Sequence, residues 1–123
     1  MIDHVGFEVS DLARTTRFYD PLFHALGARR MHESEHAVAY GINAPTVWFV
    51  VRGIGPAPAY GHVALQASGK AAVDAAYVVG LAHGGAETVP PSPPGQRPQY
   101  GRRYYAAYLS DPDGLRVEIV SRR

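Results

Sequence analysis

The chain has 123 residues, a formal net charge of +1 and no cysteine. This length favours one domain with a sizeable core. The near-neutral charge gives no reason to expect nucleic acid or a membrane surface as a partner, and the lack of cysteine excludes disulfides and thiolate chemistry. No apolar run approaches the ~20 residues of a membrane span, and the first residues lack the basic head and apolar core of a signal peptide. We therefore expect a cytoplasmic protein.

The first half of the chain predicts a strand, a helical region and three short strands. Residues 2–9 alternate between apolar and polar side chains, which is typical of a half-buried strand. An apolar stripe with helical spacing follows Asp11, a candidate N-cap. Because Pro21 should interrupt a simple helix, we expect two short helices in series. Three short strands then complete this half, at residues 29–33, 37–40 and 46–51.

The second half begins after a stretch rich in glycine and proline, residues 53–60, which predicts a linker. A helix should start near Gly69 and close at Gly84. Residues 90–103 carry four prolines in their first half and predict a long loop. The strands of this half are expected at residues 62–67, 86–89, 104–109 and 115–120.

The two halves have one order of elements, strand–helix–strand–strand–strand. The same number of residues separates His4 from His62 and Gly27 from Gly85. A repeat of this length indicates a duplicated supersecondary unit. We therefore predict a single α+β domain, residues 1–123, built from two βαβββ modules. Module one is residues 1–52, the linker is 53–60 and module two is 61–123.

Three of the expected strands carry a potential metal ligand opposite their apolar face: His4, His62 and Glu118. Two neutral imidazoles and one carboxylate suit a divalent ion such as Fe, Mn, Zn or Ni. Open positions on such an ion accept two oxygens of a substrate, which the ion polarises. The alternative is structural: both histidines are hydrogen-bonded in a groove, and Glu118 pairs with an arginine.

Aromatic side chains near these strands are candidates to wall a pocket for a planar substrate, since ligand pockets are largely apolar. They are Trp48, Tyr40, Tyr104 and Tyr108. Sheet core is the alternative for each of them. Residues 95–103 are basic and include Arg97 and Tyr100, so this segment predicts either a lid that meets an anionic substrate or a solvated connector.

Taken together, these segments resemble the vicinal oxygen chelate superfamily, also called the glyoxalase/bleomycin-resistance/dioxygenase family. The matching motifs are Ile2-Asp3-His4-Val5-Gly6, Gly61-His62-Val63-Ala64-Leu65, Tyr104-Tyr105-Ala106-Ala107-Tyr108, and Asp111-Pro112-Asp113-Gly114 leading to Val117-Glu118. The resemblance implies two βαβββ modules whose mixed sheets curve around a pocket. It also implies a divalent metal at His4, His62 and Glu118, with Glu118 as a catalytic residue.

A glyoxalase I of this family adds a glutamate in its fourth strand, as the repeat partner of the glutamate in the eighth. Aligning the two halves places Trp48 opposite Glu118, or Phe49 after a shift of one residue. Neither is a ligand, which argues against glyoxalase I. A lyase or isomerase and a ring-cleaving dioxygenase both stay open. The alternative is a metal-free small-molecule or drug-binding protein of the bleomycin-resistance type.

We also expect a homodimer that takes a small-molecule substrate. Each module is an open half-sheet, and two modules must face each other to close a pocket. The linker 53–60 permits pairing within one chain or exchange between two chains. With exchange, His4 of one subunit would meet His62 and Glu118 of the other, and the two sites would straddle a two-fold axis.

Overall fold

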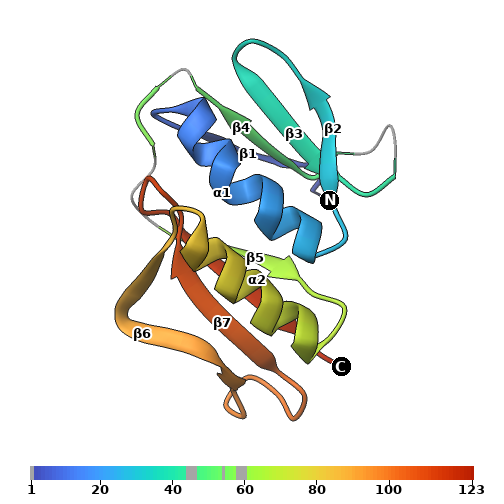
Figure 1. Ribbon diagram of the computed structural model, residues 1–123. Coiled ribbons are helices and arrows are strands. Elements are labelled where there is room, and N and C mark those ends of the chain that lie inside the picture. The colour runs from blue at the N-terminus through green and yellow to red at the C-terminus, as the bar shows by residue number, and fades with distance from the viewer. Residues whose placement is uncertain (1, 44–46, 54, 58–60) are drawn as a thin grey trace.

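The computed structural model describes residues 2–43, 47–53, 55–57 and 61–123. Residue 46, the expected start of a strand, and four residues of the expected linker, 54 and 58–60, lie outside this part. The first unit contains β1 (Val5–Glu8), α1 (Leu12–Ala25), β2 (Arg29–Glu33), β3 (Ala37–Gly41) and β4 (Phe49–Arg52). The second contains β5 (His62–Gln66), α2 (Lys70–Ala82), β6 (Ala86–Gln96), β7 (Tyr105–Ser110) and β8 (Arg116–Ser121). The predicted pair of βαβββ units is confirmed (Figure 1).

Each unit forms one mixed four-stranded sheet, and the two sheets have equivalent strand orders, β1-β4-β3-β2 and β5-β8-β7-β6. In both, the first strand pairs in parallel with the last, and the remaining pairs are antiparallel. The helices α1 and α2 lie against each other, and each covers one face of its own sheet (Figure 1). We call the opposite face of each sheet, which its helix does not cover, the open face. Neither described helix combines the length and apolar character needed to cross a membrane.

The core lies between the helices and the covered faces of the sheets. Phe18 and Leu22 of α1 have no exposed surface, and neither has Val73 of α2. On β8, Val117 and Ile119 join the same apolar cluster and are fully buried. Side chains alternate between the two faces along a strand. Because Val117 and Ile119 point into the core, the residues that alternate with them point to the open face.

Helix α1 is one continuous helix, so the prediction of two short helices was wrong. Asp11 is its N-cap, and its side chain accepts a hydrogen bond from the backbone N–H of Arg14 at 3.0 Å. Pro21 lies inside the helix and gives no N–H to it. The apolar stripe continues on both sides of Pro21, with Phe18 and Leu22 fully buried, and this packing keeps the helix intact where local preference would break it.

Strand β6 extends to Gln96, so the predicted loop over residues 90–103 is wrong for its first seven residues. The strand lies at the edge of its sheet and pairs with β7, with register shifts between Glu87 and Ser92 and between Ser92 and Gly95. Proline is tolerated at a sheet edge and at such irregularities because its missing N–H need not serve a ladder there. Figure 1 shows this strand curving along the outside of the second sheet.

A buried polar contact joins the two modules. The hydroxyl of Tyr19, on α1, donates to Oδ2 of Asp111 at 2.7 Å. The other oxygen of Asp111 accepts the backbone N–H groups of Asp113 and Leu115, each at 2.9 Å, which shapes the turn between β7 and β8. Burial raises the pKa of the Asp111 carboxyl and also that of the Tyr19 hydroxyl. The turn of module two is therefore fastened to the helix of module one.

Candidate functional site

A buried carboxylate lies on the open face of the second sheet. Glu118 of β8 is only 2% exposed. It pairs with Ala64 of β5 on one side and with Tyr108 of β7 on the other. Its neighbours Val117 and Ile119 belong to the core, so the alternation of β8 places Glu118 on the opposite face, as predicted.

Two tyrosine hydroxyls use both oxygens of this carboxylate. Tyr108 donates to Oε2 of Glu118 at 2.8 Å, and Tyr104 donates to Oε1. Burial and the hydrogen bond to Glu118 raise the pKa of Tyr108 to about 12. The same carboxylate raises the pKa of Tyr104, chiefly through its hydrogen bond. Both phenols therefore keep their protons at neutral pH and remain donors that fix the orientation of Glu118.

His62 completes a pair of potential metal ligands with Glu118. Its Nε2 lies 3.6 Å from Oε2 of Glu118. The imidazole meets the ring of Tyr108 edge-on, with the ring centroids 5.6 Å apart. The His62 side chain is 44% exposed, so it is open to a ligand, whereas the Glu118 side chain is 3% exposed and hydrogen-bonded to two tyrosines. One nitrogen donor and one oxygen donor thus converge on the same face of one sheet, a donor set that fits a first-row divalent metal.

His4 does not join this pair within one chain. It directly precedes β1 of the first sheet, and its Nδ1 lies 2.8 Å from Oδ1 of Asp3. Across residues 2–43, 47–53, 55–57 and 61–123, no group of three or more histidines and carboxylates is placed to share one metal ion. A single chain therefore brings together His62 and Glu118, two of the three predicted ligands, and leaves the third at the surface.

Val50 occupies the place in the first sheet that Glu118 occupies in the second. Val50 pairs with Gly6, and Glu118 pairs with Ala64; Gly6 and Ala64 each follow a histidine of the repeat by two residues. The predicted alignment of Trp48 or Phe49 with Glu118 was therefore wrong, because the pairing with the first strand of each module sets the register. Valine is no ligand either, so the fourth strand still supplies no carboxylate.

The predicted aromatic residues fall into different places. Tyr104 and Tyr108 contact Glu118, and Tyr100 packs against Tyr104 with ring centroids 5.3 Å apart. Tyr40 has no exposed surface, and its hydroxyl donates to Asp20 in module one. It is thus a core residue of β3, as the structural alternative held. Trp48 is 48% exposed and lines a separate cavity.

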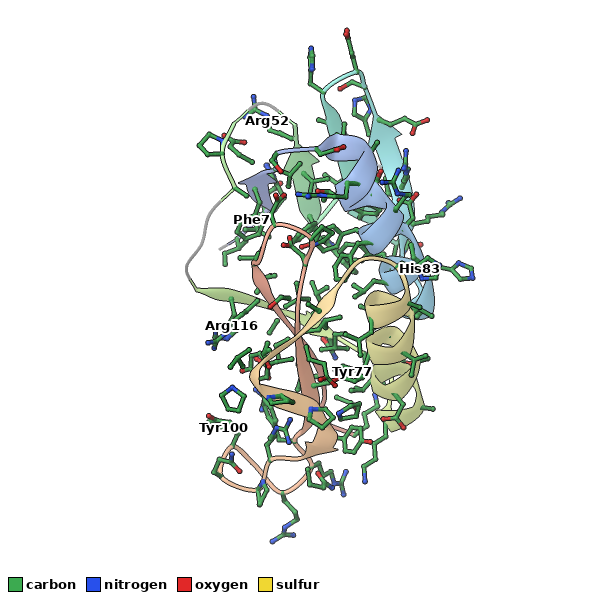
Figure 2. All side chains as sticks on the ribbon, turned by 60° about the vertical axis from the view of Figure 1, so that its left-hand side comes forward. Phe7, Arg52, Tyr77, His83, Tyr100 and Arg116 are labelled. Atoms are coloured by element: carbon green, nitrogen blue, oxygen red, sulfur yellow. The ribbon has the colours of Figure 1, made fainter. Side chains whose placement is uncertain are left out.

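Two arginines at this site were not among the predicted site residues. The guanidinium of Arg122 lies 4.7 Å from the centroid of the Tyr104 ring, and that of Arg116 lies 5.6 Å from the centroid of the Tyr108 ring. Figure 2 shows Arg116 and Tyr100 on the side of the second sheet that faces away from α2. The alternation of β8 could have found Arg116, which shares a face with Glu118. Arg97, which was predicted, donates to the side chain of Ser92 at 2.8 Å.

The cavity at Trp48 lies at the seam between the modules and has a volume of about 370 Å³. Module one contributes the start of β1, the end of α1 with the residue before β2, and the segments that flank and begin β4; module two contributes β5. The lining is almost wholly apolar and is formed by Val5, Phe23, Leu26, Ala28, Ile42, Trp48, Phe49, Val63, Ala64, Leu65 and Gln66. A ligand here would meet aromatic and aliphatic groups, with the Gln66 amide as the polar side chain.

Comparison with known proteins gives one family. The model of the Glyoxalase/Bleomycin resistance protein/Dioxygenase superfamily matches residues 1–119. A solved glyoxalase/bleomycin resistance protein from Albidiferax ferrireducens is 29% identical, with 98% of each chain covered and a TM-score of 0.86. No functionally curated protein matches this sequence.

Two more distant structures share the fold. A glyoxalase-related enzyme from Fulvimarina pelagi is 20% identical, with 98% of this chain and 87% of that chain covered and a TM-score of 0.75. A mutant of glyoxalase I from Zea mays is 23% identical with a TM-score of 0.71; 97% of this chain corresponds to 46% of that one. Because the family model spans almost the whole sequence and the paired modules have the same architecture as these structures, the chain belongs to the glyoxalase/bleomycin resistance protein/dioxygenase superfamily.

Proposed function

We propose that this protein is a metal-dependent enzyme acting on a small substrate that chelates the metal through two neighbouring oxygens. The observation that carries the proposal is the convergence of His62 and Glu118, 3.6 Å apart on one open sheet face. A carboxylate that is 2% exposed costs desolvation free energy, and such groups gather at functional sites. The hydroxyls of Tyr104 and Tyr108 offset this cost and hold the carboxylate in one orientation.

His62 and Glu118 would hold Fe, Mn, Zn or Ni, and such a metal supplies polarisation of substrate oxygens and stabilisation of an enolate or catecholate. Glu118 is also our candidate for the group that accepts a proton from the substrate. Tyr104 and Tyr108 keep the Glu118 carboxylate aligned because each donates a hydrogen bond to a different carboxylate oxygen. Since the repeat position in the first sheet holds Val50, we propose a lyase or isomerase, or a ring-cleaving dioxygenase, and not a glyoxalase I.

The third ligand, His4, would come from a second copy of the chain in a homodimer. The helices α1 and α2 lie side by side and make contact between the modules, so the open faces of the two sheets do not face each other within one chain (Figure 1). A module from another chain is therefore needed to cover the open face that carries Glu118. By the repeat, His4 holds on module one the place that His62 holds on module two. A two-fold dimer that pairs unlike modules would create two equivalent sites.

Metal titration of stripped protein tests this function. We expect calorimetry to show saturable binding of Mn, Ni, Zn or, without oxygen, Fe(II). The His62→Ala and Glu118→Gln variants should weaken it by about 100-fold or more, because the first removes a direct ligand and the second removes the negative charge of one. His83→Ala is the matched control, since His83 lies beyond α2 and its Nδ1 lies 2.8 Å from the carbonyl of Val79 (Figure 2). Unchanged affinity in both site variants would refute the proposed metal centre.

The seam cavity favours a second candidate function, metal-free binding of an apolar small molecule. Trp48 is the single tryptophan of the chain and lines this cavity, so its fluorescence reports on occupancy. We expect a naphthalene dye to change that fluorescence saturably with EDTA present. The Ile42→Glu variant should lose the response, because it places a charge at a partly exposed position of the lining. A linear response, or an equal one in this variant, would count against binding at the seam.

A further inference from the structure

A second cavity, of about 170 Å³, lies directly beside the candidate site. It is lined by Thr88, Val89, Pro90 and Ser92 of β6, by Tyr108 of β7 and by Arg116 of β8. Tyr108 belongs to both the cavity and the candidate site. Its hydroxyl donates a hydrogen bond to Glu118, and the residue also lines the cavity. A single ligand of modest length could therefore extend from one to the other.

The cavity lining includes a positive charge and hydroxyl groups beside apolar residues. Arg116 contributes a guanidinium that lies over the Tyr108 ring, with 5.6 Å between the guanidinium carbon and the ring centroid. A second guanidinium, that of Arg97, donates to Oγ of Ser92 at 2.8 Å and so holds the Ser92 side chain. In the part of the chain that the structure describes, the ion pairs of arginine with carboxylates involve Arg14 and Arg30, not these two.

Hydroxyl groups supply the other polar contacts of this cavity. The Ser92 oxygen accepts from Arg97, so its own hydrogen remains available to donate to a ligand. The Thr88 hydroxyl donates to the carbonyl of Pro90 at 2.9 Å. Glu118 is a carboxylate close to this cavity, but it does not line it, and both of its oxygens accept hydrogen bonds from tyrosines. A group in the cavity would therefore meet Arg116 and Ser92 before it meets a carboxylate.

We propose that this cavity binds the anionic end of the substrate, a carboxylate or a phosphate. Arg116 supplies the charge and Ser92 a hydrogen bond, which is the chemistry that recognises an oxyanion. A space of about 170 Å³ holds such a group and is well below the ~300–1,000 Å³ of a complete drug-sized site. That this anion belongs to the substrate rests on the proposed function. The binding itself needs no metal.

Anion titration of the metal-free protein tests the proposal. Amide chemical shifts are followed by NMR in EDTA-treated protein at constant ionic strength, with inorganic phosphate, acetate and, as the neutral isostere, acetamide. We expect saturable shifts at Thr88, Ser92 and Tyr108 with phosphate or acetate and none with acetamide. Arg116→Gln should raise the dissociation constant by about 10-fold or more, because it removes the charged hydrogen-bond partner of the anion.

Two further variants separate a specific site from general charge and from misfolding. Arg116→Lys keeps the charge and should retain part of the affinity. Arg29→Gln removes an exposed cation of β2, in the other module, that does not line the cavity and should leave the affinity unchanged. The proposal is overturned if no anion saturates, if acetamide acts like acetate, or if Arg116→Gln and Arg29→Gln behave alike. The anion titration is done without metal, so its outcome does not depend on whether the metal titration succeeds. The outcome of the metal titration likewise does not depend on anion binding, so failure of one proposal can be told from failure of the other.

Discussion

Replacing Asp111 by alanine should lower the free energy of unfolding by about 3 kcal/mol or more, since leaving a buried donor unpaired costs roughly 1–3 kcal/mol. Asp111 is 5% exposed and accepts hydrogen bonds from the Tyr19 hydroxyl and from the backbone N–H groups of Asp113 and Leu115. All three donors lose their acceptor in the variant. Urea unfolding followed by circular dichroism measures the effect.

Matched variants tell which part of the contact matters. Tyr19→Phe removes one donor and leaves the turn bonds of Asp111 in place, so it should cost about 1–2 kcal/mol. Asp111→Asn keeps one acceptor oxygen and should fall between the two. If Asp111→Ala costs no more than Tyr19→Phe, the turn bonds add nothing measurable and the account of this contact fails.

Mixing two inactive variants should restore metal binding if the modules are exchanged between chains. His4→Ala and Glu118→Ala protein should each lack a complete site, because each loses one of three proposed ligands. After subunit exchange, a mixed dimer combines intact His4 from one chain with intact His62 and Glu118 from the other. Random pairing then gives about a quarter of the wild-type number of sites, since half of the dimers are mixed and each has one good site. Calorimetric stoichiometry measures this number.

A control mixture separates exchange from other causes. His62→Ala and Glu118→Ala alter the same module, so no pairing of these chains can rebuild a site. Sedimentation equilibrium must also give the mass of a dimer. A monomer mass, or no recovery in the first mixture after exchange has been verified, would show that two chains do not share the site in this way.

Local pattern predicted much of the fold and the sheet face on which two of the candidate site residues lie. The alternation along β8 was enough to place Glu118 opposite Val117 and Ile119, and the repeat of His4 and His62 predicted the second module. The convergence of His62 with Glu118 follows from the parallel pairing of β5 with β8. The metal, the dimer and the role of His4 remain predictions.

The errors arose where tertiary packing or strand register overrides local preference. Pro21 should end a helix, yet the buried stripe on either side of it holds α1 together. The match of Trp48 with Glu118 failed because register depends on hydrogen bonding between distant strands, which motif spacing does not reveal. The hydrogen bonds from the two tyrosines to Glu118 could not be predicted from the sequence for the same reason. The pairing of β7 with β8 is what places Tyr108 beside Glu118.

The prolines of β6 have a consequence for how the protein behaves at high concentration. An exposed edge strand offers a row of N–H groups on which another chain can build a strand, the first step of edge-to-edge aggregation. In β6, adjacent prolines at 90–91 and 93–94 remove donors from both sides of the strand, so no continuous row remains whichever side faces outward. The second sheet is therefore closed to strand addition along this part of its edge, and association between copies is directed to other surfaces.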